Sequence, residues 1–352
     1  MAVSRINEAG LNVNQYGNRN IIINGAMQVA QRGTSSTGLG ATSGYYTVDR
    51  MSTAFNGTAG RLTMTQESIT DLPGFTKCVK LACTTADTSI AAAEYLIFSH
   101  NIEGQNLQQL AKGTSSAKKV TVSFYVKGNA AATYVCELQD NNSREISKSF
   151  SVTTDWTRVV LTFDGDTDSG GTIVNSNANG IGLIFWLHAG STFNSGNAGD
   201  LNTSWNAAGT GERAAGADSF FDSTSRTFFI TGIQMEVGDT ATDFEHRTFA
   251  DELLRCQRYF RDDDLYNYPI QAYIANDSYT QFNFFPEMRA APTSTVSNAH
   301  IYANGAERTG SGTCATANAA TYGITFRFSG TTGVNNEAAA LITCDATFDA
   351  EL

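Results

Sequence analysis

Short runs in which apolar and polar residues alternate recur along the first two thirds of the chain. Residues 61–66 alternate cleanly, and residues 120–128 do the same. Successive side chains of a strand point to opposite faces, so this period of two predicts strands with one buried face. Further strands are expected at 133–138, 155–163 and 227–237.

Two other segments are apolar without alternation. Residues 182–188, GLIFWLH, predict a central strand covered on both faces. Residues 21–23 predict a buried strand closed by the Asn24-Gly25 turn. Regularly spaced short strands with polar turns predict an all-β fold, a jelly-roll β-sandwich.

One segment has helical spacing instead. Thr248 opens it with a capping-box-like start, because Asp251 follows three residues later. A short linking α-helix is therefore expected over residues 248–262. An apolar stripe is expected to pack at the domain junction or between copies in an oligomer, and it comprises Phe249, Leu253, Cys256 and Phe260.

A second β region follows the helix, with strands expected at 281–285, 324–329 and 338–343. About 90 residues are enough for a smaller C-terminal β-sandwich. The expected organisation is an N-terminal arm (1–20), a sandwich (21–247), the linking helix (248–262) and a C-terminal β domain (263–352).

Composition narrows the class of protein. The net charge is −11 and no basic run exceeds Lys118-Lys119, which argues against nucleic acid and anionic membranes as partners. The apolar segments are too short for membrane insertion, and the N-terminus lacks the apolar core of a secretory signal, so synthesis in a cytoplasm is expected. The six scattered cysteines are expected to be buried free thiols.

Several motifs resemble modules of bacteriophage tail-fibre and other virion appendage proteins. They are NIIINGAMQVAQRGTS at 20–35, YTVDRM at 46–51, ITGIQMEVGDTATDFEHR at 230–247 and CQRYF at 256–260. The strand VSFYVKG at 122–128 is similar to one of galactose-binding-like jelly rolls. Met51 stands where the modules usually carry Trp, so one candidate aromatic is missing.

The resemblance implies a structural virion protein, a tail fibre or receptor-binding appendage that adheres to host-surface polysaccharide. It would be assembled in the host cytoplasm and act in the virion as a homo-oligomer, a trimer, with the arm contacting other virion proteins. The rival interpretation is a capsid decoration or fibre protein with an assembly role only. A glycan hydrolase is a more distant alternative.

Sugars stack on aromatic rings while amides and carboxylates bind their hydroxyls. Trp205 and Phe193 lie in the long Gly- and Asn-rich segment 190–217, and Tyr45 and Tyr46 lie in similar surroundings. These four are the candidate glycan-binding residues, with packing under the loop or at a subunit interface as the alternative.

Metal and catalytic patterns are sparse. Asp164, Asp166 and Asp168 alternate before a glycine and form a candidate calcium loop, with a plain acidic turn as the favoured alternative. Position twelve of an EF-hand loop would be Glu and is Asn175 here. No other cofactor is expected. The four histidines are far apart in sequence and no hydrolase motif is present, so the chain is expected not to be an enzyme.

Overall fold

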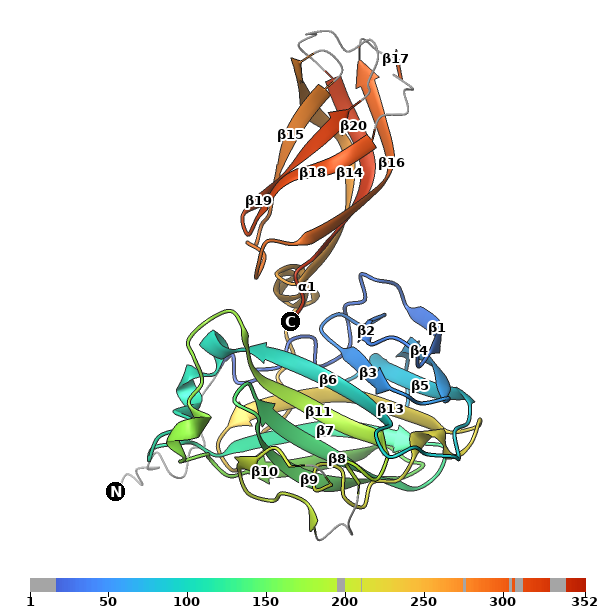
Figure 1. Cartoon of the computed structure of the whole chain (residues 1–352), viewed down its shortest axis with the longest axis vertical. Coiled ribbons are helices and arrows are strands. Elements are labelled where there is room, and N and C mark those ends of the chain that lie inside the picture. Colours follow the sequence, from blue (N-terminus) through green and yellow to red (C-terminus); the bar gives the residue numbers. More distant parts are fainter. Residues whose placement is uncertain are drawn as a thin grey trace, which may run out of the picture.

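The computed structural model describes residues 17–194, 200–209, 211–274, 277–303, 306–307, 313–329 and 340–352. They form a β-sandwich, one α-helix and a smaller β domain that stands on the sandwich (Figure 1). Most of the expected N-terminal arm, residues 1–16, lies outside the described residues.

The sandwich consists of two antiparallel sheets that face each other. One has the order β1 (Ser35–Leu39), β4 (Arg61–Ser68), β5 (Lys77–Thr85), β13 (Thr227–Val237), β7 (Val120–Gly128), β10 (Thr157–Phe163). The other has the order β12 (Asn206–Ala207), β9 (Arg144–Val152), β8 (Ala132–Asp140), β11 (Asn179–Ala189), β6 (Tyr95–Glu103), β3 (Ser52–Asn56), β2 (Gly44–Tyr45). The jelly-roll class expected from the alternating runs is thereby confirmed.

Strand β11 lies in the middle of the second sheet and is buried on both faces, as its apolar sequence predicted. Leu183, Phe185 and Leu187 point into the core between the sheets. Ile184 and Trp186 point to the opposite face, where part of the segment 190–217 covers them. This arrangement leaves the middle of the outer face without an open surface.

The strand expected at residues 21–23 is absent, and the chain bends there instead. Ile22 is buried as expected, but side-chain amides take the place of a ladder. The Asn20 side chain donates to Ile233 O (3.0 Å) and accepts from Ile22 N (3.0 Å) and Met235 N (3.1 Å). It lies opposite the irregularity in β13, where Gly232 has a φ of 63°, so regular pairing is interrupted.

The C-terminal domain is a seven-stranded antiparallel sheet that folds over its own core. Its order is β17 (Ala306–Glu307), β16 (Thr293–Ala303), β20 (Ala340–Asp349), β14 (Phe260–Ile274), β15 (Asp277–Asn283), β19 (Gly323–Ser329), β18 (Thr313–Ala320). The long strand β14 pairs with β20 from Phe260 to Ile270 and with β15 from Gln271 to Ile274, so it joins two layers. Phe326, Ile342 and Phe348 fill the space between them.

The α-helix α1 spans Phe249–Gln257, and β14 already begins at Phe260, so the helix is shorter than the 248–262 expected. Four 3-10 helices complete the described elements: η1 (Gly104–Asn106), η2 (Gln108–Leu110), η3 (Ser169–Gly171) and η5 (Phe220–Asp222). Within the described residues, no helix has the length and apolar character needed to cross a membrane.

Candidate functional site

Helix α1 is fixed at the boundary between the two domains. Thr248 Oγ1 accepts a hydrogen bond from Asp251 N (3.2 Å), which is the predicted N-cap. The buried Glu252 carboxylate accepts from Asn24 N (2.9 Å) and thereby ties the helix to the sandwich. Cys256 is fully buried beneath the helix.

Part of the predicted apolar stripe packs at the domain junction, and part is exposed to solvent. Cys256 and Phe260 are buried at the junction, and Leu253 is half-buried. Phe249 instead has 59% of its surface exposed. Leu254, next to the stripe, is also exposed.

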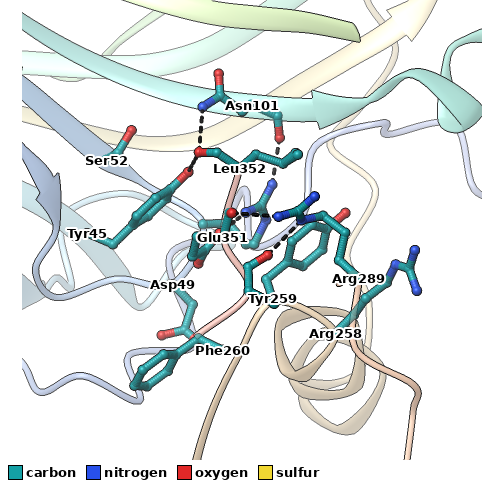
Figure 2. Close-up of polar contacts among 12 residues, drawn as sticks. Tyr45, Asp49, Ser52, Asn101, Arg258, Tyr259, Phe260, Arg289, Glu351 and Leu352 are labelled. Carbon is teal, nitrogen blue, oxygen red and sulfur yellow. Dashed lines mark hydrogen bonds and ion pairs between the residues drawn. The ribbon is translucent and has the colours of Figure 1, made fainter. Parts of the chain in front are cut away.

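The last residues of the chain lie against polar side chains of the sandwich (Figure 2). Tyr45 Oη and Asn101 Nδ2 both donate to Leu352 O, at 3.1 Å and 3.3 Å. Glu351 pairs with the buried guanidinium of Arg50, which also donates to Asn101 O (2.6 Å). The Arg50 guanidinium lies 3.5 Å from the centre of the Tyr259 ring.

Two further contacts hold the same junction. The buried Glu103 carboxylate accepts from both Arg258 nitrogens (2.8 and 2.9 Å) and from Tyr259 Oη (2.5 Å). Burial alone would raise the pKa of Glu103, but these donors lower it overall. Arg289 donates to Ala350 O (2.6 Å) and to Asn177 O (3.2 Å), so it spans the domains. Buried charge pairs thus fix the C-terminal domain on its base.

Beside this junction lies a groove of about 380 Å³ that is rich in amide side chains. The 3-10 helices η1 and η2 form one wall and the segment before β1 forms the other. Arg255 of α1 crosses its edge and donates to Asn18 Oδ1 (2.8 Å). The lining residues are Asn18, Asn20, Ile21, Ile23, Gln105, Asn106, Gln108, Gln109 and Arg255.

The chemistry of this groove suits a polyhydroxylated ligand. An amide side chain offers donors and an acceptor, which matches the paired donor and acceptor character of a sugar hydroxyl, whereas the Asn20 amide is already engaged with the backbone. Gln105, Asn106 and Gln108 are exposed, while Ile21 and Ile23 supply apolar floor. A second opening of about 550 Å³ adjoins the groove, shares Asn18 and Arg255 with it, and reaches Leu254 and Pro286.

The structure brings Trp205 together with the predicted calcium loop. Its indole Nε1 donates to Asp164 O (2.7 Å), and Lys112 Nζ lies 4.0 Å from the ring centroid. Asp166 accepts from Lys112 (2.8 Å) and Arg144 (2.7 Å). Burial raises the pKa of Asp166, but these hydrogen bonds outweigh it and bring the pKa to about 2.

The other two loop carboxylates also have protein partners. Asp164 pairs with Lys119 at 3.0 Å, and Asp168 accepts from Gly170 N at 2.8 Å. Protein cations and an amide therefore already contact all three aspartates. Calcium binding at this loop stays a prediction.

The remaining predicted aromatics lie elsewhere. Phe193 packs edge-on against Tyr95 (5.6 Å between centroids) and contacts Trp186. Tyr46 donates to Thr42 O, and Tyr45 serves the junction. The four rings have separate sets of partners, and their glycan-binding role stays a prediction.

A buried pair of carboxylates lies under the segment 190–217. Arg213 bridges them, with Nε 2.8 Å from Glu145 Oε2 and an ion pair to Glu137 at 2.5 Å. Trp186 Nε1 donates to Glu137 (3.2 Å). Burial, reinforced by the charge of Glu137, raises the pKa of Glu145 to about 7.

Sequence reasoning missed both the groove and this pair. The run GQNLQQL at 104–110 was the available signal for the groove, because four amides fall within five positions. Glu137 and Glu145 lie on neighbouring strands and gave no signal, since the pairing register was not known.

No protein-family model matches this sequence, and no curated protein matches it. Among solved structures, the enzymatically active domain of bacteriophage CBA120 tailspike protein 4 is 10% identical with a TM-score of 0.32. That match covers 62% of this chain and 21% of the tailspike chain, so this chain spans about a fifth of that protein.

Two carbohydrate-binding modules show a similar degree of likeness. A CBM4 module is 10% identical with a TM-score of 0.30, covering 61% of this chain and 97% of the module. TmCBM61 in complex with β-1,4-galactotriose is 10% identical with a TM-score of 0.31, covering 62% and 99%. None of these likenesses assigns a ligand or a role to this chain.

Proposed function

We propose that this protein is a structural component of a phage virion, a tail fibre or receptor-binding appendage that adheres to host-surface glycan. The observation that carries the adhesive role is the amide-lined groove of about 380 Å³ beside the domain junction. The motifs at 20–35, 230–247 and 256–260 support the virion setting through their resemblance to phage appendage modules. The protein would act in the virion after assembly in the host cytoplasm.

The groove would bind the glycan. No catalytic centre is evident among the described residues. The Glu137 and Glu145 carboxylates are held by Arg213. Glu236 accepts from Thr242 N (2.9 Å) and Glu245 from Asn20 N (2.7 Å), so both are occupied in local structure. We therefore propose adhesion rather than glycan hydrolysis, which an assay of reducing-sugar release from host polysaccharide tests directly.

Binding to host polysaccharide should be measured for the wild type and for a variant carrying Asn106→Ala and Gln109→Ala. These two substitutions should weaken binding at least tenfold, because they remove hydrogen bonds to the hydroxyls of the ligand without altering the core. Asn141→Ala, an exposed amide in the β8–β9 turn, is the matched control and should bind normally.

The result also distinguishes the candidate sites. If Trp205→Ala abolishes binding while the groove variant binds normally, the ligand lies at the predicted aromatic site and the groove assignment fails. If the wild type binds no host polysaccharide at all, adhesion to glycan is excluded.

The second candidate is a capsid decoration or fibre protein with an assembly role only. Exposed Phe249 and Leu254 on α1 favour it, because apolar side chains on one exposed helix are typical of a subunit interface. A homo-oligomer, a trimer, fits both candidates, with the expected N-terminal arm, residues 1–20, contacting other virion proteins. Electron microscopy of labelled particles would place the protein on the tail or the capsid.

A further inference from the structure

Three buried side chains of the kind that bind metal ions lie together outside the candidate groove. Asp87 follows β5, Glu94 precedes β6, and His188 is near the end of β11. Each offers one ligand atom, and these atoms all lie within 4.8 Å of one another. Their residues are 5%, 7% and 0% exposed.

Two atoms of this cluster are buried without a hydrogen-bond partner among the described residues, namely Glu94 Oε2 and His188 Nε2. They face each other at 3.7 Å, which is too long for a hydrogen bond. Leaving a buried carboxylate oxygen unsatisfied costs free energy, so such a pair points to an absent partner. One cation between them would satisfy both atoms.

Hydrogen bonds from the surrounding structure hold the His188 and Asp87 side chains. His188 Nδ1 lies 2.8 Å from Ser219 Oγ, which also accepts from Phe221 N (3.1 Å). An Nδ1–H donated to this oxygen leaves the Nε2 lone pair free, which is the tautomer found in metal-binding histidines.

Asp87 is held in a comparable way. Its Oδ2 accepts from Thr58 Oγ1 (2.9 Å) and Ala59 N (2.7 Å), and its Oδ1 accepts from Ser89 N (3.3 Å). Hydrogen bonds of this kind fix a ligating carboxylate and are typical of the shell around a metal.

We propose that Asp87, Glu94 and His188 form a binding site for one divalent transition-metal ion of the zinc type. One imidazole nitrogen with two carboxylates suits Zn²⁺ or Co²⁺ better than Ca²⁺, which takes six to eight oxygens. A separation of 3.7 Å between Nε2 and Oε2 is near the spacing of two ligands that each lie about 2 Å from one ion. The bound ion would join the β5–β6 connection to the end of β11.

The site is tested on the full-length protein after treatment with a chelator. Titration with Zn²⁺ should show one saturable equivalent and a concentration-dependent rise in the unfolding temperature. Co²⁺ should give the visible absorbance of a four-coordinate site, without the near-ultraviolet band of a thiolate ligand, which separates this site from the cysteines.

Glu94→Gln keeps the shape of the side chain and should weaken Zn²⁺ binding at least tenfold. Asp87→Asn is a second variant that should behave in the same way, and the exposed Glu67→Gln is the control that should bind normally. The proposal is overturned if the wild type takes up no stoichiometric Zn²⁺ or Co²⁺. It is equally overturned if both variants bind the metal with wild-type affinity.

Discussion

The guanidinium of Arg50 is paired with the carboxylate of Glu351, 301 positions later in the chain. Their side chains are only 1% and 4% exposed, so the pair is withdrawn from water. Burial lowers the pKa of Arg50, but the charge of Glu351, together with the nearby Tyr259, Tyr45 and Cys256, raises it overall.

Removing one partner of this pair should destabilise the junction strongly. Glu351→Gln leaves Arg50 charged and buried, and the loss of unfolding free energy should be roughly 3–5 kcal/mol. Urea unfolding measures the loss, and limited proteolysis should show earlier cleavage near α1. Glu67→Gln, which breaks the exposed contact with Lys80, should change stability by less than about 1 kcal/mol. Equal effects of the two substitutions would contradict this interpretation.

Lys112 should be as important inside the sandwich as Arg50 is at the junction. Its ammonium is 3% exposed and contacts both Asp140 and Asp166. Lys112→Met keeps the length of the side chain but leaves these carboxylates with less compensation, and should cost roughly 3–5 kcal/mol. Lys119→Met removes an exposed lysine from the same region and should have no measurable effect. The prediction is rejected if urea unfolding shows a larger loss of unfolding free energy for Lys119→Met than for Lys112→Met.

Glu145 should make stability fall as the pH rises through neutrality. Its pKa is raised from 4.5 to about 7 on folding, so its contribution is fully present below pH 4.5 and is lost as the pH passes 7. Glu145→Gln cannot ionise. The unfolding free energy of this variant, relative to wild type, should therefore increase between pH 5 and pH 8, by on the order of 1–3 kcal/mol. A difference that does not change with pH would disprove the assignment.

The N-cap of α1 should contribute less to the unfolding free energy than the buried ion pairs do. Thr248→Ala removes the acceptor for Asp251 N and should cost about 1 kcal/mol, whereas Thr248→Ser keeps the hydroxyl and should retain most of it. Urea unfolding of the pair of variants gives the comparison. If alanine and serine are equally stable, the hydroxyl is not what starts the helix.

The exposed apolar residues of α1 should matter for assembly and not for folding. Replacing Phe249 and Leu254 with Ser should dissociate the oligomer in sedimentation experiments, while the unfolding free energy of the monomer stays nearly constant. Val160→Ser, an exposed apolar residue on β10, is the control and should leave assembly intact. A wild-type protein that sediments only as a monomer would exclude the helix as a subunit interface.

Local patterns predicted most of the sandwich correctly because they report which face of a strand is buried. The alternation at 61–66 became β4, and the apolar run at 182–188 became the buried β11. Residues 21–23 were predicted wrongly as a strand, because the Asn20 side chain takes over bonds that a ladder would make. The apolar residues at 21–23 indicated burial, but they did not indicate the conformation of the backbone.

The candidate sites depend on contacts between distant residues and were therefore not visible in the sequence. The groove is lined by segments far apart in the chain, and Arg255 at its edge bonds Asn18, which lies 237 positions earlier. The cluster of Asp87, Glu94 and His188 likewise needs two chain segments about a hundred residues apart. His188 ends the apolar run at 182–188 and is fully buried, so the run indicated its burial but not its neighbours.

Phe260, where the chain enters the C-terminal domain, pairs directly with Asp349, where it leaves. The β14–β20 ladder therefore begins at the base of the domain and runs upward from it (Figure 1). Traction at the far end would be carried down both strands together to the base, because both strands are held there. Peeling the two strands apart one bond at a time would require a sideways pull at the base, where the Arg50 and Glu103 contacts resist it.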